Sequence, residues 1–183
     1  MQSDLALDRE QSLLLVIDVQ EKLAAAMKGR EQLERNVAVL IQAARRLGLP
    51  IVATEQYPKG LGHTVAALRD LLGDQPMEKM EFSCGASKPI ARRIVTTGRK
   101  QVIVAGMEAH VCVFQTVRDL LRGEFAVFVV EDAVLSRTEA NRATGLRLCE
   151  KAGATLTSTE TVLFDLLGVA GTPEFKELAP LIK

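Results

Sequence analysis

The chain contains several short runs that are apolar at almost every position, and each has the length of a β-strand. The clearest lie at 13–17, 101–105 and 125–130, with amphipathic stretches of helix length between them. A strand that is apolar throughout is buried on both faces, as in a parallel sheet covered by helices. The alternation therefore predicts an α/β fold: a three-layer α/β/α sandwich, Rossmann-like, with a parallel sheet of about six strands.

The same patterns predict the order of the elements along the chain. We expect strands at 13–17, 51–54, 77–79, 101–105, 125–130 and 155–157. We expect helices at 32–47, 64–72, 88–97, 111–122, 139–152 and 159–167, with a loop at 55–63. A chain of 183 residues suits a single domain spanning 1–183. Its tail at 168–183 contains Pro173 and Pro180 and is expected to be irregular.

Positive and negative charges balance, with 23 Lys plus Arg against 23 Asp plus Glu. This balance gives no electrostatic reason to expect nucleic acid or an anionic membrane as a partner. Aromatic residues make up only 4% of the chain, so surfaces for base stacking are not expected. The N-terminus carries Asp4, Asp8 and Glu10 where a secretion signal would be basic and then apolar. We therefore expect a cytoplasmic protein with no membrane partner.

The potential metal and disulfide ligands are few and are not spaced as a site. They are Cys84, Cys112, Cys149, His63 and His110. No CxxC, HxH or HExxH pattern occurs, so neither a disulfide framework nor a zinc site is indicated. The glycines at 60 and 62 follow a loop and lack the third glycine of a dinucleotide fingerprint. We therefore expect no metal and no cofactor.

Ligands of open parallel sheets bind beyond the carboxyl ends of the strands. That rule selects Asp18, the segment 55–57, Lys79 and the turn 106–112, with Asp132 as a weaker candidate. Each has an ordinary alternative role. The alternative role of Asp18 is to cap the segment that follows its strand, since Asp favours such positions. A lone lysine such as Lys79 is usually a solvated surface residue.

Cys112 lies in the first turn of the helix expected at 111–122, directly after a turn that contains Gly106. The positive end of a helix dipole favours a thiolate, and the free N–H groups there can hold an oxyanion. The alternative is a small buried hydrophobic residue. Cys149 lies mid-helix and is expected to pack in the core. Cys84 lies in a loop near Lys79, where it either lines a pocket or is an inert filler.

Three strand-end segments together resemble the isochorismatase-like cysteine hydrolase superfamily. They are Leu-Leu-Val-Ile-Asp-Val-Gln (14–20), Lys-Met-Glu-Phe-Ser (79–83) and Gly-Met-Glu-Ala-His-Val-Cys-Val (106–113). The later segments 129–137 and 157–164 are also similar, so the resemblance spans about residues 10 to 167. The segment 54–62 resembles the isochorismatase domain-containing branch. The nicotinamidase metal site is not matched, because Glu55, Tyr57 and His63 have the wrong spacing for it.

The resemblance implies a catalytic triad of Asp18, Lys79 and Cys112. It further implies a cis peptide between Met107 and Glu108, and an oxyanion site made by the backbone N–H groups of Glu108 and Cys112. The side chains expected to line the substrate pocket are Gln20, Tyr57, Phe82 and His110, although Gln20 could instead bond within its own loop and His110 could cap the helix. Assembly as a homo-oligomer, a dimer or larger, is also implied.

The leading functional hypothesis is a hydrolase that cleaves a C–N bond of a small amide through a thioester on Cys112. In the family the isochorismatases proper generally lack this cysteine, so its presence argues against isochorismate as the substrate. Three alternatives stay open. They are an isochorismatase-type hydrolase of a non-amide substrate, a non-catalytic binding protein on the same fold, and a redox-sensing thiol with Cys84 as its partner.

Overall fold

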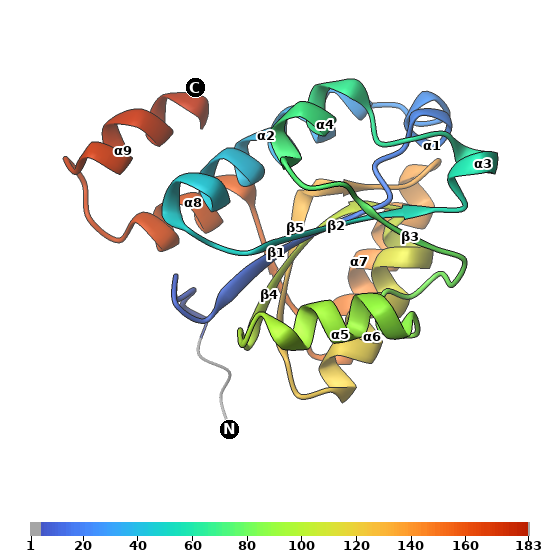
Figure 1. Cartoon of the computed structure of the whole chain (residues 1–183). Coiled ribbons are helices and arrows are strands. Elements are labelled where there is room, and N and C mark those ends of the chain that lie inside the picture. The colour runs from blue at the N-terminus through green and yellow to red at the C-terminus, as the bar shows by residue number, and fades with distance from the viewer. Residues whose placement is uncertain (1–4, 183) are drawn as a thin grey trace.

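The computed structural model describes residues 5–182, which contain one six-stranded sheet (Figure 1). All neighbouring strands are parallel, in the order β3-β2-β1-β4-β5-β6. The strands are β1 (Ser12–Ile17), β2 (Ile51–Gln56), β3 (Met77–Lys79), β4 (Gln101–Met107), β5 (Ala126–Leu135) and β6 (Thr155–Thr157). The predicted α/β fold with a parallel sheet of about six strands is confirmed.

Strand β1 shows how the apolar runs build two cores. All six of its residues are buried. Because successive side chains of a strand point to opposite faces, Leu14 and Val16 enter one core while Leu13 and Leu15 enter the other. Continuous apolarity is therefore required here, since neither face of β1 contacts water.

Helices cover both faces of the sheet (Figure 1). One face packs against α2 (Arg30–Leu47), α4 (Ala66–Leu72) and α8 (Thr159–Leu167). The other packs against α5 (Lys88–Thr96), α6 (Phe114–Arg122) and α7 (Glu139–Ala152). Among the described residues, no helix is both long enough and apolar enough to cross a membrane.

The expected loops contain two short helices, and some strands run further than predicted. Helix α1 (Glu21–Ala25) follows β1, and α3 (Pro58–Leu61) lies within the expected loop at 55–63. Strand β5 continues to Leu135, five residues beyond its predicted end. Its extension includes the exposed Glu131 and Asp132, so an apolar pattern alone could not reveal it. The extension matters because it carries the chain to the same edge as the end of β4.

Within its described part, residues 168–182, the tail is not irregular throughout as expected. It forms α9 (Pro173–Leu178) and a 3₁₀ turn, η2 (Ala179–Ile182). The Thr172 side chain caps α9 by accepting the N–H of Phe175, and Pro173 occupies the first turn, where a proline is tolerated. Leu178 is buried against α2 and α8, and Arg46 of α2 pairs with Glu177. The two prolines therefore begin helical segments and do not prevent them.

The order of the strands places a crevice at the end of β1. This strand pairs with β2 on one side and β4 on the other, so Ile17 is level with both Thr54 and Gly106. The direction of chain progression reverses between β1 and β4, and such switch points are where ligands bind in open α/β sheets. The segments that follow β1, β2, β3 and β4 therefore converge at one edge.

Candidate active site

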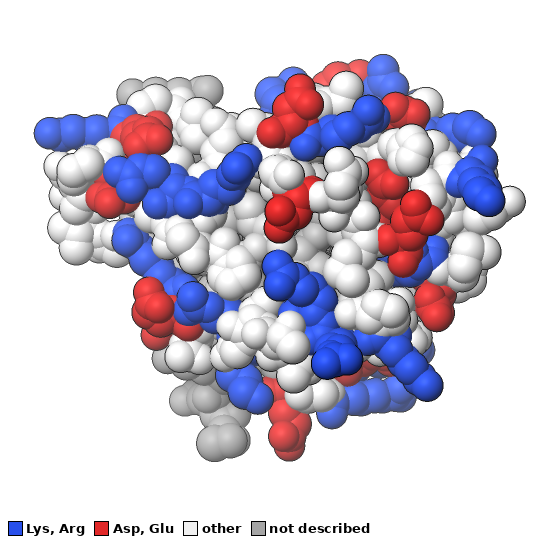
Figure 2. Space-filling model, viewed as in Figure 1, with Lys and Arg blue, Asp and Glu red and all other residues white. Residues whose placement is uncertain are grey.

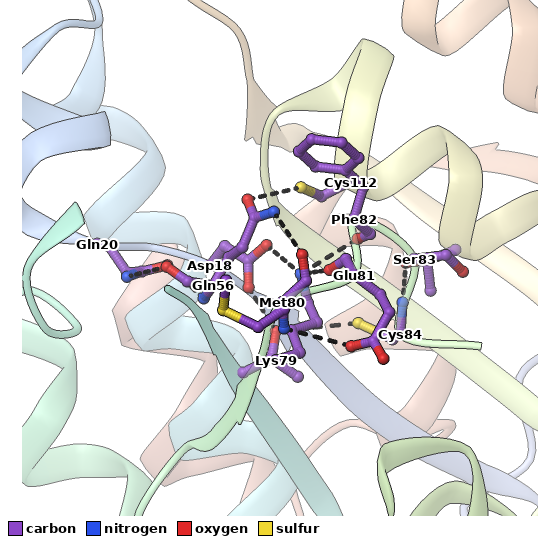
Figure 3. Close-up of polar contacts among 12 residues, drawn as sticks. Asp18, Gln20, Gln56, Lys79, Met80, Glu81, Phe82, Ser83, Cys84 and Cys112 are labelled. Atoms are coloured by element: carbon purple, nitrogen blue, oxygen red, sulfur yellow. Dashed lines mark hydrogen bonds and ion pairs between the residues drawn. The ribbon is translucent and has the colours of Figure 1, made fainter. Parts of the chain in front are cut away.

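Asp18 is the first residue beyond β1, and it is completely buried. Its backbone has a φ of 50°, a left-handed conformation that Asp tolerates better than most residues. One carboxylate oxygen, Oδ1, accepts a hydrogen bond from the Thr54 hydroxyl at 2.8 Å. The other, Oδ2, lies 2.6 Å from Nζ of Lys79 (Figure 3). Asp18 is therefore half of a buried ion pair.

The Lys79 side chain is also fully buried, and its ammonium has a partner for each of its three protons. Besides Asp18, Nζ donates to the carbonyl oxygens of Glu81 and Phe82, both at 3.1 Å. Burial lowers the pKa of Lys79, but the Asp18 carboxylate, together with smaller contributions from Cys84 and Cys112, raises it by more, so the pKa lies above its ordinary value. Lys79 is thus a fixed cation that orients Asp18, and it has no proton free for a substrate.

Cys112 reaches the same crevice, although its local structure differs from the prediction. It lies in a π-helical turn, η1 (Ala109–Val113), which precedes α6, and is not in the first turn of an α-helix. Burial raises the pKa of the Cys112 thiol, and the nearby Asp18 carboxylate raises it further. Lys79 lowers it, but its charge is already balanced by Asp18. The raised pKa favours a neutral resting thiol over the expected thiolate, so a base is needed to remove its proton.

Two glycines allow the turn at 106–112 to approach the sheet and α7 closely. A Cβ on Gly106, which has a φ of 126°, would clash with the carbonyl oxygen of Ile17 in β1. A Cβ on Gly145 of α7 would lie 2.5–2.6 Å from backbone atoms of Ala109 and His110. Both positions are close backbone approaches that only glycine permits. The glycine at 106 lets the end of β4 lie close to β1, and the glycine at 145 lets η1 pack directly against α7.

The peptide between Met107 and Glu108 is cis, as the resemblance implied. The buried Glu108 carboxylate contacts the segment that follows β5. There its Oε2 accepts hydrogen bonds from the backbone N–H and from Nε of Arg137, both at 3.1 Å. This pair ties the turn before Cys112 to the end of β5.

The four expected pocket residues fall into two groups. Tyr57 and Phe82 are about half exposed, at 49% and 52%. Tyr57 borders an open groove of about 460 Å³ that is also lined by Met80 and Glu81. Phe82 lies on the same side of the cluster as Cys112 in Figure 3. Both side chains are therefore accessible from solvent, and Tyr57 borders a groove that also reaches Lys79.

Gln20 and His110 have protein partners. The buried Gln20 amide donates to the backbone oxygens of Gln56 and Gly62 and accepts the N–H of Gln56 at 2.7 Å, so it braces its own loop. Nδ1 of His110 lies 3.1 Å from the hydroxyl oxygen of Ser136. Gln20 thus positions the end of β2 and has no donor left for a ligand.

The remaining candidates at this edge have structural partners. Glu55 accepts the N–H and hydroxyl of Thr64, and its second oxygen lies 3.0 Å from Nδ1 of His63. Asp132 accepts the N–H of Thr159 at 2.8 Å and so supports the start of α8. Within residues 5–182 no group of three or more His, Cys, Asp or Glu side chains is arranged to hold a metal ion.

The sequence did not single out two side chains that complete the cluster. Thr54 holds Asp18, as described above, and Oε1 of Gln56 lies 3.7 Å from Sγ of Cys112. Both belong to β2, and Gln56 lies within the selected segment 55–57. A threonine is common in any strand, so Thr54 gave no functional signal. Gln56 was indicated only by its position at the end of a strand.

The other two cysteines are not positioned as nucleophiles. Cys84 is fully buried, with Sγ 3.9 Å from the Thr54 hydroxyl, and burial raises the pKa of its thiol to about 11. Cys149 is buried between α7 and the sheet, where burial raises the pKa of its thiol to about 12. Both behave as the inert core residues that the sequence suggested.

Comparisons with known proteins agree on one family. The family model described as "Isochorismatase domain" matches residues 12–161. Isochorismatase domain-containing protein 2 of Danio rerio is 38% identical over 172 residues, which cover 93% of this chain and 86% of that protein.

Two solved structures share the whole fold. The MAR1 ribonuclease of Caenorhabditis elegans has a TM-score of 0.89 at 40% identity, covering 97% of this chain and 92% of that one. The YcaC protein of Escherichia coli, described as an octameric hydrolase of unknown specificity, has a TM-score of 0.92 at 25% identity. The match covers 100% of this chain and 91% of that one.

Proposed function

The chain belongs to the isochorismatase family of hydrolases, in the branch of isochorismatase domain-containing proteins, and on this premise we propose that it is a cysteine-dependent amidase of small molecules. The observation that carries the proposal is the buried ion pair of Asp18 and Lys79 beside the thiol of Cys112. A buried pair of charges is a poor way to stabilise a fold, so it suggests a chemical role.

In the first half of the reaction Asp18 takes the thiol proton as Sγ of Cys112 attacks the substrate carbonyl carbon. A C–S bond forms, and the carbonyl oxygen becomes an oxyanion held by the backbone N–H groups of Glu108 and Cys112. Asp18 then gives its proton to the nitrogen, the C–N bond breaks, and the amine leaves. The acyl group remains on Cys112 as a thioester.

In the second half Asp18 takes a proton from water, and the water oxygen attacks the thioester carbonyl. The C–S bond breaks, the sulfur takes back the proton from Asp18, and a carboxylic acid leaves. Lys79 keeps its proton in both halves. Its role is to keep Asp18 charged and aimed at the thiol, since all three N–H groups are already bound.

A hydrolysis screen of small amides and ureides tests the proposal. We expect release of ammonia or amine by the wild type and none by Cys112→Ala, while Cys149→Ala, a cysteine variant in the core away from the crevice, retains activity. Acid quenching during turnover followed by peptide mass spectrometry is expected to find the acyl group on Cys112. Full turnover by Cys112→Ala on a confirmed substrate would show that the covalent mechanism is wrong.

The redox alternative is less well supported. Burial holds the thiols of Cys84 and Cys112 in the protonated form, as their raised pKa values indicate, whereas peroxide-sensing thiols are thiolates. After peroxide treatment we expect no Cys84–Cys112 disulfide in a non-reducing peptide map.

We propose that the substrate is a small molecule and not RNA, although one solved relative is named a ribonuclease. Basic and acidic side chains are mixed over the face drawn in Figure 2, and the chain carries equal numbers of both. A surface that binds phosphate backbones has an excess of Lys and Arg. Incubation with labelled single-stranded RNA is expected to leave it uncut.

We also propose a cytoplasmic homo-oligomer. The free cysteines among the described residues suit a reducing compartment, and a structural relative is described as an octamer. Size-exclusion chromatography with light scattering is expected to give a mass of a dimer or larger, and a monomer at micromolar concentration would contradict this part. Fractionation of cells from the native source tests the location, and recovery of the protein from the medium would oppose it.

A further inference from the structure

A carboxamide lies closer to the proposed nucleophile than the mechanism requires. Oε1 of Gln56 is 3.7 Å from Sγ of Cys112 and accepts its thiol proton (Figure 3). Gln56 is the last residue of β2 and is almost completely buried, at 9% exposed. A buried polar side chain at this point needs an account, because the triad of Asp18, Lys79 and Cys112 is complete without it.

The backbone of Gln56 is fixed from both sides. The Gln20 side chain holds its N–H at 2.7 Å and its carbonyl oxygen at 3.0 Å, in the way that a neighbouring strand would. On the other side Gln56 pairs in register with Lys79 of β3. The place from which the carboxamide projects is therefore set by the sheet and by one buried glutamine.

The carboxamide itself is only loosely bound. Its Nε2 donates to the carbonyl oxygen of Met80 at 3.4 Å, near the limit for a hydrogen bond, and its contact with the thiol is also long. By contrast, Asp18 and Lys79 are joined at 2.6 Å. The side chain of Gln56 can therefore exchange its partners when a substrate enters, while the ion pair remains in place.

The reaction removes one of those partners. When the thiol proton moves to Asp18, Oε1 of Gln56 loses its donor. A buried acceptor without a donor is unfavourable, so a substrate that supplies an N–H at this point is favoured in the transition state. An ester oxygen or a fully substituted amide nitrogen has no proton to supply.

We propose that Gln56 determines specificity by accepting an N–H of the scissile nitrogen, so that the enzyme prefers primary amides and ureides to esters and tertiary amides. This inference rests on the proposed function, in which Cys112 is the nucleophile. It assigns Gln20 a positioning role, because Gln20 fixes the backbone that carries the carboxamide.

Two alkylating probes test the proposal without a known substrate. The first is 2-chloroacetamide, whose nitrogen has two protons, and the second is 2-chloro-N,N-dimethylacetamide, whose nitrogen has none. The rate of alkylation of Cys112 is measured for each probe at one mildly alkaline pH by peptide mass spectrometry. The proteins are the wild type, Gln56→Met without the acceptor, and Gln56→Glu, which keeps it.

The selectivity ratio is the rate with the first probe divided by the rate with the second. We expect this ratio to fall about fivefold in Gln56→Met, as for loss of one hydrogen bond. In Gln56→Glu both rates fall because the added charge disfavours the thiolate, but the ratio is retained. The bulk of the methyl groups affects every variant, so only the change in ratio reports the contact.

Two other outcomes would contradict the specificity role of Gln56 or the proposed function. An equal ratio in the wild type and Gln56→Met overturns the specificity role while leaving Cys112 as the nucleophile. Failure of both probes to label Cys112 in the wild type contradicts the proposed function, and the inference falls with it. If circular dichroism shows that Gln56→Met does not fold, Gln56→Ala is the second variant without the acceptor, and the same ratio decides.

Discussion

Nζ of Lys79 lies 2.6 Å from Oδ2 of Asp18, and neither side chain has any surface exposed to solvent. Replacing Lys79 by Met leaves a buried carboxylate without its partner, which costs about 3–5 kcal/mol. We therefore expect Lys79→Met to lower the free energy of unfolding by that amount in urea titrations. The matched control is Lys88→Met at the exposed start of α5, which is expected to change it by less than about 0.5 kcal/mol.

The double variant Asp18→Asn with Lys79→Met separates pairing from packing. Removing both charges abolishes the unpaired carboxylate, so we expect the double variant to unfold at a higher urea concentration than Lys79→Met alone. A double variant that is less stable than Lys79→Met would show that the loss comes from packing.

The resting state of Cys112 is predicted to be a neutral thiol. Burial and Asp18 both raise the pKa of this thiol, so the thiolate forms only above the range of an ordinary cysteine. The ultraviolet thiolate absorbance of the wild type minus that of Cys112→Ala is expected to show no rise between acidic and neutral pH. A rise at or below neutral pH would indicate a preformed thiolate.

We expect the free energy of unfolding to fall at alkaline pH because of the buried thiol of Cys149. Burial raises the pKa of Cys149 to about 12, whereas a thiol in the unfolded chain ionises near about 8.5. The stabilising contribution of the neutral thiol is fully present below the pKa that it has in the unfolded chain. It is lost as the pH rises toward the pKa that it has in the folded protein. The loss is about 1.4 kcal/mol per pH unit in that window. We expect Cys149→Ala to flatten the alkaline limb of a plot of unfolding free energy against pH, and an unchanged limb would contradict this.

Gly145 is predicted to hold the turn η1, which carries Cys112, in place. An alanine in a helix interior normally stabilises by about 1 kcal/mol relative to glycine. At this position its Cβ would lie 2.5 Å from the backbone of Ala109, so we expect Gly145→Ala to destabilise by about 1–2 kcal/mol and to lower turnover. Ala143→Val, on the exposed side of α7, is the control for added bulk and is expected to have little effect on either.

The sheet could be predicted from the sequence because its strands are buried on both faces. A short run that is apolar at every position, such as the one in β1, fits a strand that is buried on both faces. The rule that ligands bind beyond the carboxyl ends of strands then predicted that Asp18 and Lys79 lie at one edge of the sheet. Two features were beyond that reasoning. The π-helical turn depends on how η1 packs against Gly145 of α7, and the docking of α9 depends on a surface made by α2 and α8.

The electrostatics of the site were also beyond the sequence. The start of a helix suggested a thiolate at Cys112, but the pKa of the thiol also depends on the charges around it, and a lysine acidifies a thiol only when its own charge is not neutralised. Here Asp18 takes the charge of Lys79, and only distances can show this. Thr54 was missed, and Gln56 was selected only as part of the segment 55–57, for a similar reason. The sequence does not show whether a side chain at the end of a strand points into the crevice or away from it.

Two of the three hydrogen bonds donated by Nζ of Lys79 go to main-chain oxygens, those of Glu81 and Phe82. Every amino acid supplies a main-chain carbonyl, so the ammonium does not depend on which side chains occupy these positions. Mutations there can reshape the entrance to the crevice and leave the reacting groups where they are. We therefore expect that substitutions at 81 and 82 can change which molecules reach the crevice while the ion pair of Asp18 and Lys79 stays in place.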